Sequence, residues 1–348
     1  MSNKYLRRRL HVPVAGVAIV LLLTLGTAIA CPPLAVVEEV PKVVNIYTSR
    51  HYGMEAVFAK FTEETGIEVR FTFGETAALR ERLKAEGRHT PADVYMAVDA
   101  GNLWLAAQEG LLQPIQSQVL ERNIPAAMRD PQNRWFGLTL RLRTILYHPD
   151  RVDPAELSTY EALADPKWRG RLIMRPATHV YTQSLVASLI AAHGEARAEE
   201  IVRGWMANEP MMIDSDTRML EILAAGGGDV AIANHYYLGR LLNADPGFPV
   251  RVFWANQGDR GVHANVNGAG VTTYARNREA AIKLLEWLSG PGQGRFAGGN
   301  FEFPVNPEVA PHPIIAGFGD FMVDPISLAE LGRLQAAAVR SLDQAGYR

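Results

Sequence analysis

From residue 42 onward the chain alternates short apolar runs with longer segments of helical period, and this alternation constrains the fold more than any other feature. Two segments, residues 56–65 and 77–86, are predicted to be helices, the first of which stops at Gly66. Three apolar runs have the composition of buried strands: residues 43–47, 67–73 and 92–98. Strands and helices in this order favour an α/β fold with mostly parallel sheets.

Two longer β-rich stretches, residues 135–147 and 264–273, are predicted to be extended strands that cross between two lobes. Roughly 318 residues follow the first thirty, which is enough chain for two globular lobes. The predicted division is lobe 1 over residues 42–138 with a return segment over 267–310, lobe 2 over residues 139–266, and a C-terminal helical segment over residues 311–348.

Residues 1–30 are predicted to be an export signal, because basic residues at positions 4 and 7–9 precede an apolar stretch that ends at Ala30. The run Arg7-Arg8-Arg9-Leu10 resembles the twin-arginine pattern of proteins exported in the folded state, and it also suits an ordinary charged signal start. Either route would carry the protein out of the cytoplasm.

The single cysteine of the sequence, Cys31, directly follows Ala28-Ile29-Ala30. A cysteine at this boundary can be a lipid attachment point, but Ala28 and Ala30 also form the small-x-small pattern of simple signal cleavage. Residues 31–41 are predicted to be a proline-containing linker. With its one cysteine at the boundary, the mature chain would have no disulfide and no thiolate metal site.

Without residues 1–30 the chain would carry 31 Lys and Arg residues against 37 Asp and Glu residues, a net charge of −6. The basic residues are scattered along the sequence, which argues against a nucleic-acid partner. After residue 30 the sequence has no apolar run long enough to span a bilayer.

Two adjacent tyrosines, Tyr236 and Tyr237, follow a predicted buried strand and precede a helix predicted to open at Leu238. Adjacent helix positions diverge by about 100°, so the two phenols are expected to converge at the turn between strand and helix. Phenolate oxygens are hard anionic ligands that suit ferric iron, and positive charge from Arg240 would help to keep them ionised. The alternative interpretation is one core tyrosine and one surface tyrosine.

Two further junctions between a strand and a helix carry tyrosines. His51 and Tyr52 follow the first strand, directly after Arg50, and Tyr181 follows a strand near His179. Ligands of open α/β sheets bind at the carboxyl ends of strands, so these side chains are candidates for one site. The alternatives are that His51 caps a helix against which Tyr52 packs, and that His179 rather than Tyr181 is the ligand.

Four segments, residues 47–52, 157–170, 183–189 and 233–240, resemble the ferric-iron-binding proteins of bacterial ABC importers, in particular the cyanobacterial type. The resemblance extends from about Val43 to Pro304. It implies a type II periplasmic-binding-protein fold, in which two hinge strands join two α/β lobes and the ligand lies in the interlobe cleft. It also implies a non-enzymatic monomer that binds Fe³⁺ in the periplasm and delivers it to an ABC-transporter permease.

The same resemblance implies five iron ligands: His51, Tyr52, Tyr181, Tyr236 and Tyr237. Related sites differ in whether the histidine binds the metal, so the sequence does not decide whether His51 is a ligand. Arg50 and Arg240 would be nearby countercharges, and Cys31 suggests a tethered form. Four phenolates around Fe³⁺ leave a charge of about −1, which one arginine balances, whereas Fe²⁺ would leave about −2. Such a site would need no carbonate or phosphate as an additional ligand.

Two other functions fit parts of the sequence. The same fold could bind a small organic or oxyanion ligand, with the tyrosines as hydrogen-bond donors and Arg50 and Arg240 holding a carboxylate or phosphonate. A secreted enzyme is the other alternative, but the sequence contains neither Gly-x-Ser-x-Gly nor His-Glu-x-x-His. It also offers no convincing carboxylate pair at the candidate site, since Asp214 and Asp216, which are close in sequence, are interpreted as part of a solvated loop before a helix.

If residues 28–31 direct lipid attachment, Cys31→Ala should move the protein from the membrane fraction to the soluble fraction without changing ligand affinity. Residues 31–41 would then be a tether that keeps captured ligand close to a membrane partner. Cell fractionation with immunoblotting measures the change. Identical soluble fractionation of wild type and variant would instead support simple cleavage.

Overall fold

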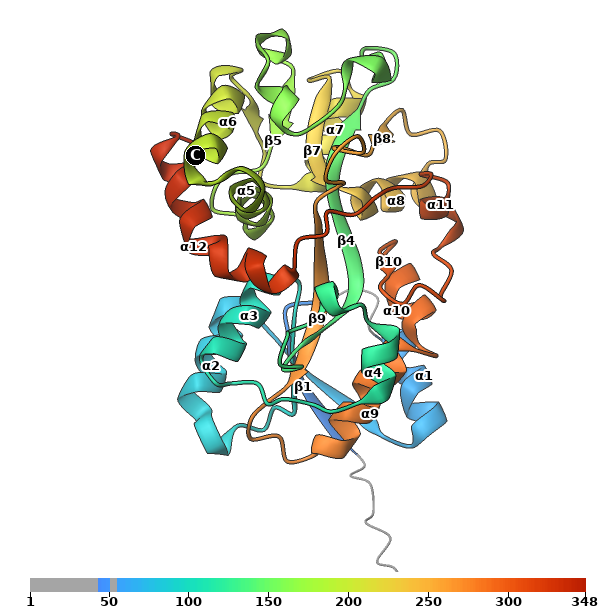
Figure 1. The fold of residues 1–348 in the computed structure, drawn as a ribbon. Coiled ribbons are helices and arrows are strands. Elements are labelled where there is room, and N and C mark those ends of the chain that lie inside the picture. Colours follow the sequence, from blue (N-terminus) through green and yellow to red (C-terminus); the bar gives the residue numbers. More distant parts are fainter. Residues whose placement is uncertain (1–42, 51–54) are drawn as a thin grey trace, which may run out of the picture. The chain divides into compact units, whose positions relative to one another are not determined.

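The computed structural model describes residues 43–50 and 55–348 (Figure 1). The predicted export signal, the linker with Cys31, and the candidate ligands His51 and Tyr52 lie outside the described residues. No helix in the described ranges is both long and apolar enough to cross a membrane.

The first lobe contains the alternating strands and helices expected from the sequence. Strand β1 runs parallel to both β2 and β3. Gly66 follows the first helix with a positive φ of 72°, and its N–H donates to the carbonyl of Thr62 at 2.8 Å, which ends the helix as predicted. The elements are β1 (Val43–Thr48), α1 (Glu55–Thr65), β2 (Glu68–Phe73), α2 (Thr76–Glu86), β3 (Val94–Ala97), α3 (Ala100–Gln108) and α4 (Gln118–Asn123).

The second lobe repeats this arrangement, since β5 runs parallel to β6 and β7. Ser215 caps the helix after β6 by accepting a hydrogen bond from the backbone N–H of Arg218. The elements are β5 (Leu172–Met174), α5 (Val180–His193), α6 (Glu195–Ala207), β6 (Met211–Met212), α7 (Asp216–Ala224), β7 (Val230–Asn234), α8 (His235–Ala244) and β8 (Arg251–Phe253).

Two long strands, β4 (Phe136–Tyr147) and β9 (Ala264–Val271), join the lobes in the sheet order β2-β1-β3-β9-β4-β7-β5-β6. The first half of β4 pairs with β9, and its second half pairs with β7 and β8. The prediction of two crossing strands is therefore confirmed. The expectation of mostly parallel sheets is wrong for these strands, whose pairs are antiparallel. Strand β4 leads from the first lobe into the second, and β9 leads back in the opposite direction beside it.

After β9 the chain returns to the first lobe and then ends in a long helix that contacts both lobes. This helix, α12, packs against α3 and α5 (Figure 1). Its close approach to α3 requires Gly332, because a Cβ there would lie 2.5 Å from Cβ of Trp104. The elements are α9 (Arg278–Ser289), α10 (Gln293–Gly298), β10 (Phe303–Pro304), α11 (Pro313–Ala316) and α12 (Leu328–Gln344).

Short 3-10 helices connect the larger elements, and the buried Tyr160 beside one of them fixes the point where β4 and β9 enter the second lobe. Its hydroxyl donates to the carbonyl of Arg143 at 2.5 Å and accepts from the N–H of His263 at 3.0 Å. The short helices are η1 (Gly87–His89), η2 (Ala126–Met128), η3 (Pro154–Glu156), η4 (Glu161–Ala164) and η5 (Pro166–Trp168).

A fully buried carboxylate, Glu302, connects β1 to β4. It accepts hydrogen bonds from Nη1 of Arg50 at 2.8 Å and from Nε of Arg141 at 3.2 Å, and the side chains of Thr139 and Asn300 also donate to it. Burial alone would raise the pKa of Glu302, but the two guanidinium groups outweigh burial and hold its pKa at about 2. Glu302 is therefore ionised at neutral pH.

Glu302→Ala is expected to lower the free energy of unfolding by about 3–5 kcal/mol at pH 7, because two buried guanidinium groups lose this carboxylate. The folded-state pKa lies below the unfolded value, so the stabilisation is present above the unfolded pKa and is lost as pH falls toward about 2. Guanidinium unfolding at pH 7 and at acidic pH measures both effects. The exposed Glu209, paired with Arg169, provides the control, and an equal loss in Glu209→Ala would contradict the argument.

Candidate metal centre

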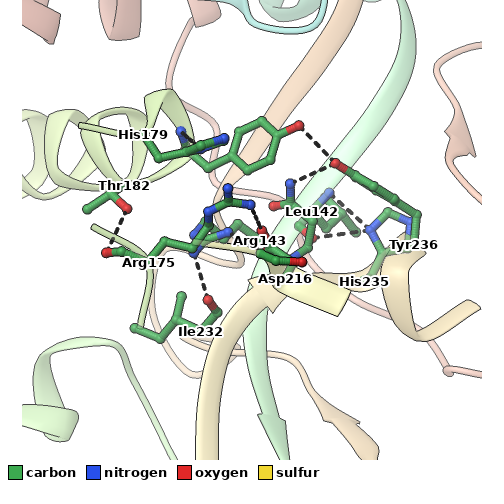
Figure 2. A network of polar contacts seen from close by, with 12 residues as sticks. Leu142, Arg143, Arg175, His179, Thr182, Asp216, Ile232, His235 and Tyr236 are labelled. Atoms are coloured by element: carbon green, nitrogen blue, oxygen red, sulfur yellow. Dashed lines mark hydrogen bonds and ion pairs between the residues drawn. The ribbon is translucent and has the colours of Figure 1, made fainter. Parts of the chain in front are cut away.

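Two tyrosines from different helices meet at the carboxyl ends of β5 and β7. The hydroxyl of Tyr236, in the first turn of α8, donates to the hydroxyl of Tyr181, in the first turn of α5, at 3.1 Å (Figure 2). Asn234, the last residue of β7, donates from Nδ2 to the hydroxyl of Tyr236 at 3.1 Å. The structure therefore brings together two of the tyrosines that the sequence singled out.

Tyr237 lies beside this pair, with its ring centroid 4.5 Å from that of Tyr236. Tyr236 is fully buried, and Tyr237 is partly buried. Helix α8 begins at His235 and not at Leu238, so both tyrosines occupy its first turn and the predicted position of the helix start is wrong. The strand runs directly into the helix, and no separate turn lies between them. Burial raises the pKa of Tyr237 above its ordinary value, and the charge of Tyr181 adds to the effect.

Four guanidinium groups lie close to the three phenol rings. Arg141 is 4.7 Å from the ring centroid of Tyr236, and Arg240 is 5.2 Å from that of Tyr237. Arg143 and Arg175 lie 5.8 Å and 5.9 Å from the ring of Tyr181.

Of these arginines, Arg240 was predicted from the sequence, while Arg141, Arg143 and Arg175 were not. One sequence pattern could have indicated them: Arg141 and Arg143 alternate with apolar residues in a stretch predicted to be a strand. Arginine is almost never fully buried unless it is paired, so this pattern indicates buried ion pairs.

The interpretation of Asp214 and Asp216 as a solvated pair is right for Asp214 and wrong for Asp216. Asp214 is 76% exposed, whereas Asp216 is fully buried. Nη1 of Arg143 donates to Asp216 at 2.9 Å, Arg175 also donates to it, and the N–H of Asn234 donates at 3.2 Å (Figure 2). Burial would raise the pKa of Asp216, but Arg143 and Arg175 outweigh it and the pKa is lowered. Asp216 therefore fixes two arginines beside Tyr181.

The two predicted countercharges, Arg50 and Arg240, are linked through Glu302. Arg50 pairs with Glu302 directly. Nε of Arg240 donates to Oδ1 of Asn300 at 2.8 Å, and Nδ2 of Asn300 donates to Glu302. A chain of hydrogen bonds thus runs from the end of β1 to the arginine next to Tyr237.

The described part of the site has an excess of positive charge. Five arginines face three carboxylates, which leaves a net charge of +2 while the phenols are protonated. The residues are Arg50, Arg141, Arg143, Arg175 and Arg240 against Asp214, Asp216 and Glu302. This excess lowers the free-energy cost of ionising the nearby phenols, although burial still holds the pKa of Tyr237 above its ordinary value. It also favours anionic over cationic ligand complexes.

His179 caps α5, since its Nδ1 accepts a hydrogen bond from the N–H of Tyr181 at 3.2 Å. Burial and the charges of Arg175 and Arg143 lower the pKa of His179 to about 4, so it is neutral at neutral pH. His235, the first residue of α8, is fully buried, with its ring centroid 4.8 Å from that of Phe303.

A cavity of about 10 Å³ lies next to Tyr181 and is lined mostly by polar side chains. Its lining includes Arg141, Arg143, Ser184 and Asn265. This volume is close to the minimum that one water molecule needs. A wider cavity of about 590 Å³ lies beside the C-terminal end of α5, away from the tyrosines.

Known proteins similar to this chain are bacterial solute-binding proteins. Iron uptake protein A1 of Synechocystis sp. is 45% identical over 316 residues, which cover 88% of this chain and 87% of that protein. The structure of Trichodesmium FutA (IdiA) in complex with iron and citrate matches with a TM-score of 0.84 and 42% identity, covering 88% of this chain and 100% of the other. The ferric binding protein from Campylobacter jejuni matches with a TM-score of 0.82 and 34% identity, again covering 88% and 100%.

These structures have the mixed α/β fold of type II periplasmic-binding proteins, which confirms the predicted fold class. The family described as bacterial extracellular solute-binding protein matches residues 44–297, most of the chain. The chain therefore belongs to the family of bacterial extracellular solute-binding proteins.

Proposed function

We propose that this protein binds ferric iron through tyrosine phenolates and delivers it to the membrane permease of an ABC importer. The observation that carries the proposal is the meeting of Tyr181, Tyr236 and Tyr237 among arginines whose charge exceeds that of the paired carboxylates. Phenolate oxygens prefer hard, highly charged cations. Relatives named for iron uptake and ferric iron binding support the same ligand.

The charge balance favours a trivalent ion. Four phenolates around Fe³⁺ carry a charge of about −1, and the positive excess of the described arginines offsets it. Tyr181, Tyr236 and Tyr237 would supply three of the phenolates, and Tyr52 the fourth. His51 is proposed as the remaining ligand. Arg50, one residue before it, is already fixed on Glu302 at the end of β1.

Delivery would use the two lobes and the strands between them. The proposed lobes are residues 42–138 with 267–310, and residues 139–266. Strands β4 and β9 connect them and would be the hinge for closure around the ion. The protein would act as a monomer in the periplasm, held at the inner membrane if Cys31 is acylated, and would not catalyse a reaction.

The rival ligand is a small organic acid or oxyanion bound by the same residues. It requires Arg50 and Arg240 to face the ligand as a clamp. In the described residues these two arginines donate to Glu302 and Asn300, which gives them a role in holding the site together. Purified protein mixed with ferric iron should turn orange to red, because tyrosinate-to-iron charge transfer absorbs visible light. A colourless sample that retains a small organic molecule would support the rival.

Tyr236→Phe and Tyr237→Phe should each weaken ferric binding by about 3–5 kcal/mol while leaving the fold intact, because each change removes one phenolate and almost no volume. Competition with a chelator measures the affinity, and circular dichroism checks the fold. Tyr274, which is 53% exposed, provides the control, and Tyr274→Phe should bind iron as wild type does. Unchanged affinity in both site variants would refute the assignment of these residues.

Iron affinity should fall steeply on acidification. The raised pKa of Tyr237 keeps this phenol protonated at neutral pH in the iron-free protein, so iron must displace its proton. In the loaded protein the ligating phenols are ionised, and the stability contributed by iron is present at higher pH and lost as pH falls. Thermal unfolding with and without iron across the acid range measures this. An iron-induced shift that does not vary with pH would contradict proton release.

A further inference from the structure

The side chain of Asn267, on β9, is buried without hydrogen bonds. Its relative exposure is 0%, and within the described residues neither Nδ2 nor Oδ1 has a partner. Buried polar groups in proteins are almost always hydrogen-bonded, and each exception calls for an explanation. Leaving a buried amide unsatisfied costs free energy that an apolar side chain of the same shape would not cost.

The register of the sheet places Asn267 on the face that builds the candidate metal centre. Asn267 lies opposite Thr139, and Asn265 lies opposite Arg141. Residues at alternate positions share one face of a sheet, so these four side chains lie on the same face. Thr139 and Arg141 both donate to Glu302, and Arg141 and Asn265 line the cavity beside Tyr181.

Asn265, on the same face, has hydrogen-bond partners for both polar atoms of its side chain. Its Oδ1 accepts from the N–H of Ala100 at 2.9 Å, and its Nδ2 donates to Asp99 at 2.6 Å and to Ser184 at 2.7 Å. The two asparagines share the strand, the face and the burial. Among the residues that the structure describes, only the side chain of Asn265 has protein partners, so a role in protein structure explains the amide of Asn265 and does not explain that of Asn267.

We propose that Asn267 is a positioning residue of the metal centre, whose carboxamide binds an oxygen atom that enters with the ferric ion. This inference rests on the proposed function. A carboxamide both donates and accepts hydrogen bonds, so it suits a metal-bound water, and its N–H groups also suit an oxygen of an anion carried with the metal. Asn267 would hold that oxygen in place without itself ligating iron.

Asn267→Leu tests the proposal, since leucine has the same number of side-chain heavy atoms and no polar group. The unfolding temperature of the iron-free variant should equal or exceed that of wild type, because an unsatisfied amide is removed. Its ferric affinity should fall roughly tenfold to a hundredfold, as for one lost hydrogen bond in a charged site. The visible charge-transfer band of the loaded variant should shift, which a purely structural residue would not cause.

Asn265→Leu is the matched control and should lower the unfolding temperature, because it removes satisfied hydrogen bonds. Asn267→Ser keeps a donor and an acceptor and should recover part of the affinity. A lower unfolding temperature in Asn267→Leu, or failure of that variant to fold, would overturn the proposal by showing that the amide supports the protein itself. Unchanged affinity and an unchanged band would overturn it equally.

The oxygen atom could belong to a metal-bound water or to an anion carried with the metal, and the form in which iron is supplied distinguishes the two. Ferrous salt oxidised by oxygen in carbonate-free buffer brings no organic anion, whereas ferric citrate does. An Asn267→Leu defect under both conditions identifies a metal-bound water, and a defect with citrate alone identifies the anion. If wild-type protein binds no iron at all, the proposed function fails, while the unfolding temperatures of the two asparagine variants still report whether the amide is satisfied.

Discussion

The site depends on two buried carboxylates that hold arginines in place. Glu302 fixes Arg50 and Arg141, and Asp216 fixes Arg143 and Arg175. A guanidinium group is costly to bury alone, so without these carboxylates the arginines could not lie beside phenol rings in the interior. Each carboxylate is shared between two arginines, which leaves positive charge in excess. The position and sign of the local field therefore follow from how these pairs are arranged.

That field acts on phenols whose ordinary state is neutral. Burial raises the pKa of Tyr237, while Arg141 lowers it, and the net direction is upward. The first turns of α5 and α8 also carry partial positive charge from unpaired backbone N–H groups, which favours anions there. The arginines and the helix ends together lower the free energy needed to ionise the phenols, but they do not make ionisation favourable at neutral pH. Only the entry of a strongly charged cation would supply the remaining free energy.

The sequence predicts the elements better than it predicts the site. Apolar runs and helical periods locate the strands, helices and crossing strands, because these depend on local patterns of side chains. Tyrosines at strand-to-helix junctions could be picked out for the same reason. The pairing of Asp216 with Arg143 could not be predicted from the sequence. The two residues are 73 positions apart, and they meet only because of the order of the strands in the sheet. The burial of Asn267 likewise becomes visible only when β9 lies between β3 and β4.

One hydrogen-bond chain connects both lobes to the tyrosines: Arg50 to Glu302, Glu302 to Asn300, and Asn300 to Arg240. Arg50 lies two residues after the first strand of one lobe, and Arg240 lies on the helix that carries Tyr237 in the other. A change at either end alters the partners available at the other, because a buried polar network is stable only when every member is satisfied. The position of the phenols is thereby tied to the residues that follow β1, so the same arginines that place positive charge beside the phenols also connect the two lobes.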